Sequence, residues 1–116
     1  MALTDATKNA MLDLLSTRAA FLSLHTADPG STGMSEATGG SPAYARKSAT
    51  WSSASGGSKA LSSAVTFDVP AGTYTHVGYW SAGSGGTYSG SRALTASTTF
   101  GGQAQLTISA VTESLT

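Results

Sequence analysis

The feature that most restricts the fold of this sequence is a change in the spacing of its apolar residues after residue 18. Before that point apolar residues recur at helical intervals, whereas the rest of the chain alternates apolar and polar residues in short segments separated by Gly, Pro and Ser. Alternation of this kind is typical of strands with one buried face. It predicts a mainly β fold, an antiparallel β-sandwich with jelly-roll or Greek-key-like connections and one short N-terminal α-helix. We expect a single domain over residues 1–116, with the helix in 1–18 and the β-sandwich in 19–116.

Six segments carry the alternation: 19–26, 44–51, 64–70, 74–82, 87–96 and 104–111. Pro70 ends the third segment because proline cannot donate a hydrogen bond to a strand ladder. The glycine-rich residues 83–86 predict a hairpin between the two segments that flank them. The last segment is the most regular, and the residues expected to face inward there are Ala104, Leu106, Ile108 and Ala110.

The N-terminal segment predicts one amphipathic helix over about residues 5–17. Thr4 is a suitable N-cap, and Asp5 faces the positive end of the helix dipole. One side of the helix carries a narrow apolar stripe of Leu3, Ala6, Ala10, Met11 and Leu14. We expect this stripe to pack on its own domain, and a neighbouring subunit is the alternative partner.

Two segments lack regular spacing. The longest irregular stretch, residues 28–42, starts with Asp28, Pro29 and Gly30, which predict a tight turn because Pro presets φ and Gly accepts a positive φ. The Ser/Gly-rich tract 52–63 is expected to be mobile unless a partner orders it. Loops as long as 28–42 are often functional, and neither this loop nor the helix is needed to close the sandwich. The candidate interface residues are therefore Leu3, Ala6, Ala10, Met11, Leu14, Asp28, Pro29, Gly30 and Met34.

The stretch "HTADPGSTG" at 25–33 brings His25, Asp28 and Ser31 close in sequence, and these are the residue types of a hydrolase triad. The Pro-Gly turn explains Asp28 without catalysis, and no G-x-S-x-G nucleophile elbow is present in the sequence. The two histidines, in a chain without cysteine, also lack the spacing of a zinc site. We expect no enzymatic activity, no metal and no cofactor, and a small hydrolase is only the third hypothesis.

The low charge of the chain bears on its partners. Charged residues make up 10% of the sequence and the net charge is zero, against roughly 25% charged residues in an average soluble domain. This surface lacks the positive field that nucleic-acid binding needs, so we interpret Arg46 and Lys47 as a solvated edge-strand pair. No segment approaches the ~20 apolar residues that span a bilayer, and the N-terminus lacks the features of a signal peptide. We expect a soluble chain made in the cytoplasm, with no nucleic-acid or membrane partner and a tendency to assemble.

The aromatic residues leave one binding function open. Exposed rings on small β-sandwiches can stack on sugars, so Trp51 and Trp80 are candidate glycan-stacking residues. In a small sandwich, large aromatic side chains more often fill the core or an interface. Glycan binding is therefore the second hypothesis for this chain.

The sequence also resembles a family of small phage and prophage proteins that are commonly labelled phage tail fibre proteins or minor virion structural proteins. The most distinctive blocks are "LHTADPG" at 24–30, "YAR" at 44–46, "VPAG" at 69–72 and "THVG" at 75–78. The resemblance spans nearly the whole chain and implies a non-enzymatic virion component, made in the bacterial host and located on the tail or as a decoration of the capsid. It implies contacts with other virion proteins and with copies of itself, as a trimer or cyclic array. Attachment to a host surface glycan is the alternative.

Overall fold

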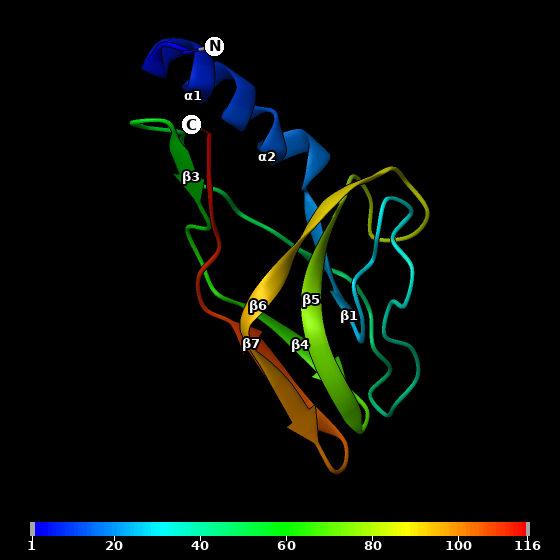
Figure 1. Cartoon of the computed structure of the whole chain (residues 1–116). Coiled ribbons are helices and arrows are strands. Elements are labelled where there is room, and N and C mark those ends of the chain that lie inside the picture. The colour runs from blue at the N-terminus through cyan, green and yellow to red at the C-terminus, as the bar shows by residue number, and fades with distance from the viewer. Residues whose placement is uncertain (1, 116) are drawn as a thin grey trace.

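The computed structural model describes residues 2–115, in which two short helices precede eight strands (Figure 1). The expected mainly β fold with a short N-terminal helix is confirmed. The elements in chain order are α1 Asp5–Asp13, α2 Leu15–Arg18, β1 Phe21–His25, β2 Lys47–Ser48, β3 Ser58–Ala60, β4 Val65–Val69, β5 Gly72–Trp80, β6 Tyr88–Phe100, β7 Ala104–Ile108 and β8 Thr112–Ser114.

The strands form one four-stranded antiparallel sheet in the order β2-β1-β5-β6 and two smaller antiparallel pairs, β4-β7 and β3-β8. In the larger sheet, Leu22 lies opposite Tyr79 and Leu24 lies opposite Val77. Residues that oppose each other across antiparallel strands share a face of the sheet. These four buried side chains therefore point to the same side, and they form one half of the core.

The other half of the core comes from the β4-β7 pair. Val65, Phe67 and Val69 on β4 are buried while Thr66 between them is exposed, so the alternation predicted for this strand is correct. The prediction for the last segment is wrong at Ala110, which is exposed. Regular pairing of β7 ends at Ile108, and the inward-facing phase shifts by one residue before β8, so that Val111 is buried instead.

The face of the four-stranded sheet away from this core is also covered. Ser23 and His25, which alternate with Leu22 and Leu24 along β1, are fully buried as well. The long connection 26–46 lies over that side, and only Lys47–Ser48 of the expected strand 44–51 pairs as β2. The sequence predicted one buried face of β1, whereas the structure buries both faces.

The N-terminal helix begins at the predicted residue, but the side that faces the rest of the chain is not the predicted apolar side. The Thr4 hydroxyl accepts a hydrogen bond from the Thr7 N–H as N-cap, and the helical turns are interrupted at Leu14. The expectation that the apolar stripe packs on its own domain is wrong, because 49% of Met11 and 56% of Leu14 are exposed. Leu12 is the residue that α1 buries.

Polar side chains attach α1 to the turn before β3. The Asn9 Oδ1 accepts the Gly57 N–H at 3.0 Å, and the Asp13 Oδ1 accepts the Ala54 N–H at 3.0 Å. The Lys59 ammonium, on a residue only 3% exposed, donates to the same Asp13 oxygen at 2.9 Å. The tract 52–63, expected to be mobile without a partner, thus contains β3, whose partners are β8 and α1 of the same chain.

Candidate functional site

The long connection 26–46 begins with the predicted turn. The Asp28 Oδ1 accepts the Gly30 N–H at 2.9 Å, and Gly30 has a φ of +64°. The Pro29 carbonyl accepts the N–H groups of Gly33 and Met34, each at 3.0 Å, and the Pro29 side chain is buried. The interpretation of Asp28 as a turn residue is therefore correct.

A buried chain of hydrogen bonds joins this connection to the sheet. The His25 Nδ1 lies 2.7 Å from the Met34 carbonyl, which can only accept, so Nδ1 carries the proton. The His25 Nε2 is then the acceptor for the Ser23 hydroxyl at 2.6 Å, and the Ser23 Oγ in turn accepts the Trp80 Nε1–H at 2.9 Å. Every donor and acceptor in this chain of four groups has a partner.

The surroundings of His25 keep it neutral. Burial lowers its pKa, and this effect outweighs the Met34 carbonyl and the Glu36 carboxylate, both of which favour the protonated ring. Ser23, the hydroxyl that His25 contacts, is fully buried, and the Asp28 carboxylate is engaged in its own turn. The arrangement positions a loop on a sheet, and it does not place an accessible nucleophile beside a base and an acid.

A second polar cluster holds the end of the same connection. Arg46 binds the Glu36 carboxylate with two nitrogens, at 2.9 Å and 3.0 Å, and the Tyr44 hydroxyl donates to the same carboxylate at 2.9 Å. Arg46 also donates to the Gly85 carbonyl in the β5-β6 hairpin at 2.8 Å, and its guanidinium carbon lies 3.6 Å from the centre of a Trp80 ring. Burial alone would raise the pKa of Glu36, but the hydrogen bonds from Arg46 and Tyr44 hold it below its usual value.

Sequence reasoning missed this cluster. The Arg46 side chain is only 10% exposed, so the interpretation of Arg46 as a solvated residue is wrong. Glu36 is 10 residues away and the hairpin carbonyls are more than 30 residues away, so local spacing gives no sign of them. The one signal in the sequence is the "YAR" block at 44–46, which contains two of the three side chains of the cluster.

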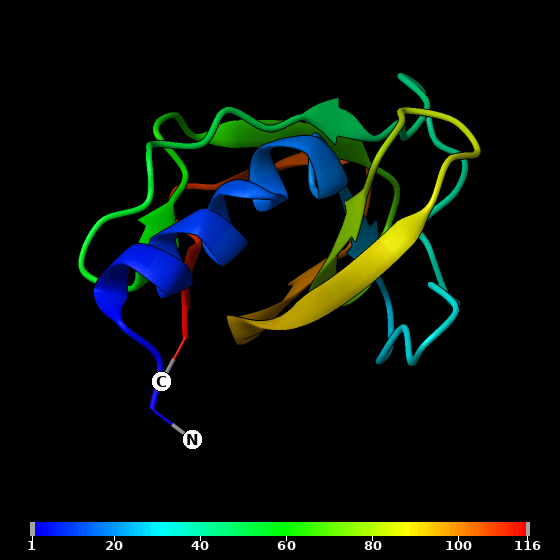
Figure 2. The same ribbon diagram turned by 90° about the horizontal axis from the view of Figure 1, so that it is seen from above.

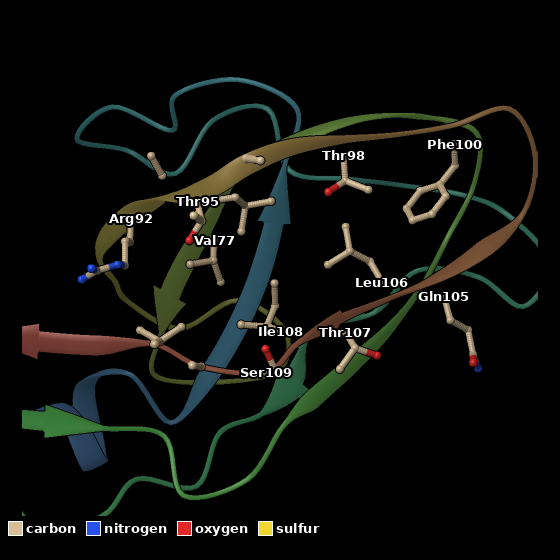
Figure 3. A pocket seen from close by; sticks show the side chains of 15 residues that line it. Val77, Arg92, Thr95, Thr98, Phe100, Gln105, Leu106, Thr107, Ile108 and Ser109 are labelled. Atoms are coloured by element: carbon tan, nitrogen blue, oxygen red, sulfur yellow. The ribbon is translucent and has the colours of Figure 1, made fainter.

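A groove of about 320 Å³ lies between β6 and β7 (Figure 3). Its apolar lining includes Leu94, Phe100, Leu106 and Ile108, and threonines and Gln105 form much of the rest. Arg92, its one charged lining residue, is paired with Glu113 of β8.

Within residues 2–115, no three His, Cys, Asp or Glu side chains gather closely enough to hold a metal ion.

A family model for "Podophage GP4 fiber I protein gp80" matches residues 2–116. The chain belongs to this family. It is therefore a structural protein of the phage virion, as the resemblance of its sequence blocks to phage fibre proteins implied. A search of curated proteins gave no match. In the part of the chain that the structure describes, no helix is both long and apolar enough to cross a membrane.

In this fibre-family protein, most of the candidate interface residues lie at the surface. On the helix, Ala6, Ala10, Met11 and Leu14 are exposed and Leu3 is half-buried. On the connection 26–46, Asp28, Gly30 and Met34 are exposed, whereas Pro29 is buried and so contributes through the turn that it forms. Figures 1 and 2 show the helix and this connection on different parts of the molecule, so they form two separate surfaces.

Both indoles of the fibre-family protein are half-buried. The Trp51 Nε1–H donates to the Ala19 carbonyl at 2.9 Å, and its ring meets Tyr79 edge-on with 6.0 Å between centroids. Trp80 is covered by Arg46 and lies 5.2 Å from the Tyr88 ring, and its N–H is bound to Ser23. Both rings thus have structural contacts within the chain, and their role in glycan stacking stays a prediction.

Proposed function

We propose that the protein is a multi-copy component of a phage fibre that acts through contacts with other copies of itself and with other virion proteins. The exposed apolar stripe of the N-terminal helix is the observation that supports this proposal. Met11 and Leu14 are about half exposed, although Asn9 and Asp13 on the other side of the helix accept hydrogen bonds that hold it to the rest of the chain. An apolar surface that is held outward in this way is typical of a protein contact.

The charge of the chain supports the same proposal. With a net charge of zero, copies of the protein experience little mutual repulsion, and apolar contacts between them are not opposed by a long-range field. Closed symmetry, whether a two-fold dimer, a trimer or a larger ring, is the usual arrangement of identical subunits.

A matched pair of lysine substitutions tests the proposal. Leu14→Lys places a charge in the stripe, whereas Ser16→Lys places the same charge at an exposed position on another side of the helix. We expect Leu14→Lys to reduce incorporation into particles and the mass of the assembly measured by light scattering, and Ser16→Lys to change neither. Equal incorporation of Leu14→Lys and the native chain would show that the stripe is not the contact surface.

Absence of the native chain from purified particles would refute the virion proposal itself. This result is independent of the comparison between the two lysine variants.

A further inference from the structure

The sheet edge formed by β6 is long and has no strand beside it within residues 2–115. β6 has 13 residues and pairs with β5 on one side only, whereas β2 at the other end of the sheet has two residues. Among the described residues, no backbone hydrogen bond joins β6 to any other segment on its outer side. Figure 2 shows the ribbon of β6 at the margin of the molecule, and Figure 3 shows β7 across the groove from it. The outward N–H and C=O groups are therefore free to pair with an added strand.

This edge lacks two of the features with which proteins commonly protect an exposed strand, namely charge and proline. Arg92 is the only charged residue of β6, and its guanidinium is turned toward β8, where it binds the Thr112 carbonyl and Glu113. The exposed side chains that remain are small and neutral, among them Ala93, Thr95 and Ala96. The edge thus presents hydrogen-bonding groups without a net charge.

Two register shifts interrupt the edge, one between Tyr79 and Trp80 of β5 and one between Tyr74 and His76. The register with β5 passes from Tyr74 opposite Thr98 to His76 opposite Ala93, which leaves additional residues of β6 without partners on β5. A bulge bends a strand and strengthens its twist locally. The regularly paired stretch between the two shifts, 90–93, has four residues, a little fewer than the roughly five to six of an average strand.

The apolar groove opens along the same strand. Leu94 and Phe100 come from β6 and Leu106 and Ile108 from β7, and the two strands lie on the two sides of the groove in Figure 3. Because β6 is the last strand of its sheet, a strand added beside it would extend the sheet over this opening. The added strand would then remove apolar lining from water in addition to pairing its backbone groups.

We propose that β6 pairs antiparallel with β6 of a second copy of the protein, which deepens the assembly role proposed above. Length favours this occupant, because the other strands with a free edge have between two and five residues, whereas a second β6 can follow the edge over all 13 residues. Charge also favours it, since two uncharged edges meet without repulsion and each Arg92 is already paired within its own chain. Antiparallel pairing of identical strands creates a two-fold, self-complementary interface. The four-stranded sheets of the two copies then form one continuous sheet.

A single-cysteine scan tests the pairing directly, because the native chain has no cysteine to give background cross-links. In a two-fold pair, a residue near the axis opposes its own copy with Cα atoms about 4.5–5.5 Å apart, which is within the range of a disulfide. We expect oxidation to cross-link copies efficiently at one position, or two adjacent positions, between 89 and 99. Thr66→Cys on β4 and Met11→Cys on the helix are the comparison sites.

A charge exchange provides an independent check. The exposed position of β6 that cross-links most efficiently is changed to Lys and to Glu in separate variants, and we expect each to weaken self-association by about two- to fivefold, since like charges on opposing strands are unfavourable. We expect a mixture of the two variants to associate again, because opposite charges then meet. Thr66→Lys adds the same charge elsewhere and should have no effect.

Three outcomes would overturn the pairing: cross-links at Met11→Cys alone, an assembly with an odd number of copies, or failure of the mixed variants to associate. Any of these could occur in a chain that still enters particles. They would therefore leave the proposed role in the fibre standing.

Discussion

Gly78 tests the role of the buried hydrogen bonds between β1 and β5. Gly78 lies directly opposite Ser23 in the sheet. A Cβ added at this glycine would lie 2.5 Å from the Ser23 Oγ and 2.6 Å from the His25 Nε2. Real Cβ atoms essentially never approach so closely, so Gly78→Ala must separate the two groups or move a strand.

The expected loss of stability follows from this geometry. Overpacking a close-fitted interior costs about 1–3 kcal/mol, and a buried polar group left without its partner costs about 1–3 kcal/mol more. We therefore expect Gly78→Ala to lower the free energy of unfolding by roughly 2–6 kcal/mol, a large part of the stability of a typical domain. In a chain of this length, that loss corresponds to a fall in Tm of roughly 8–24 °C.

The measurement is urea or thermal unfolding followed by tryptophan fluorescence, since Trp80 donates to Ser23 in the affected group. Gly101→Ala is the matched control, because Gly101 has an ordinary φ and nothing lies within 4 Å of an added Cβ. We expect Gly101→Ala to change stability by less than about 1 kcal/mol. If Gly78→Ala unfolds as Gly101→Ala does, the buried Ser23–His25 contact does not stabilise the fold as argued.

Three further predictions concern ionisable groups. Burial lowers the pKa of His25 in the folded state below the usual 6.5. The contribution of neutral His25 to stability is therefore complete above pH 6.5 and is lost as the pH falls toward the folded-state pKa. Urea midpoints that stay constant from pH 7.5 to 5 would contradict this prediction. Arg46→Leu removes one hydrogen-bond donor from each oxygen of the Glu36 carboxylate and should lower the free energy of unfolding by about 2 kcal/mol. The control, Arg18→Ala at the surface, should change the free energy of unfolding by less than about 0.5 kcal/mol. Equal effects of the two variants in urea unfolding would contradict this prediction. Lys59→Ala removes the ammonium group that holds α1 through Asp13. The backbone amides of α1 should then exchange hydrogen faster, while the exchange rates in β4 do not change. Unchanged exchange in α1 would show that other contacts hold the helix.

Where local chemistry decided the structure, the sequence was sufficient. The buried positions of β4 follow from strict alternation of apolar and polar residues. The turn at Asp28 follows from the fixed φ of Pro29 and the positive φ of Gly30. The hairpin at 83–86 was visible because its glycines separate two alternating segments, which form β5 and β6. Each of these predictions needed no information from elsewhere in the chain.

Where distant segments decided the structure, the sequence was not sufficient. The helix turns its apolar stripe outward because Asn9 and Asp13 bind backbone groups more than 40 residues away. The pair β3-β8 has only three residues in each strand, and β3 lies in a Ser/Gly-rich tract without alternation. The same limit applies to the proposed docking edge of β6, which is free only because no later strand of the described chain pairs with it.

The attachment of α1 to β3 has a consequence for the order of events during synthesis. β3 pairs with β8, and α1 is bound to the turn before β3, so elements from the two ends of the described chain share one support (Figure 1). Of these three elements α1 is made first, and the β3–β8 pair can form only after residues 112–114 have been made. The apolar stripe on α1 is therefore held on its complete support only when both strands of that pair are present.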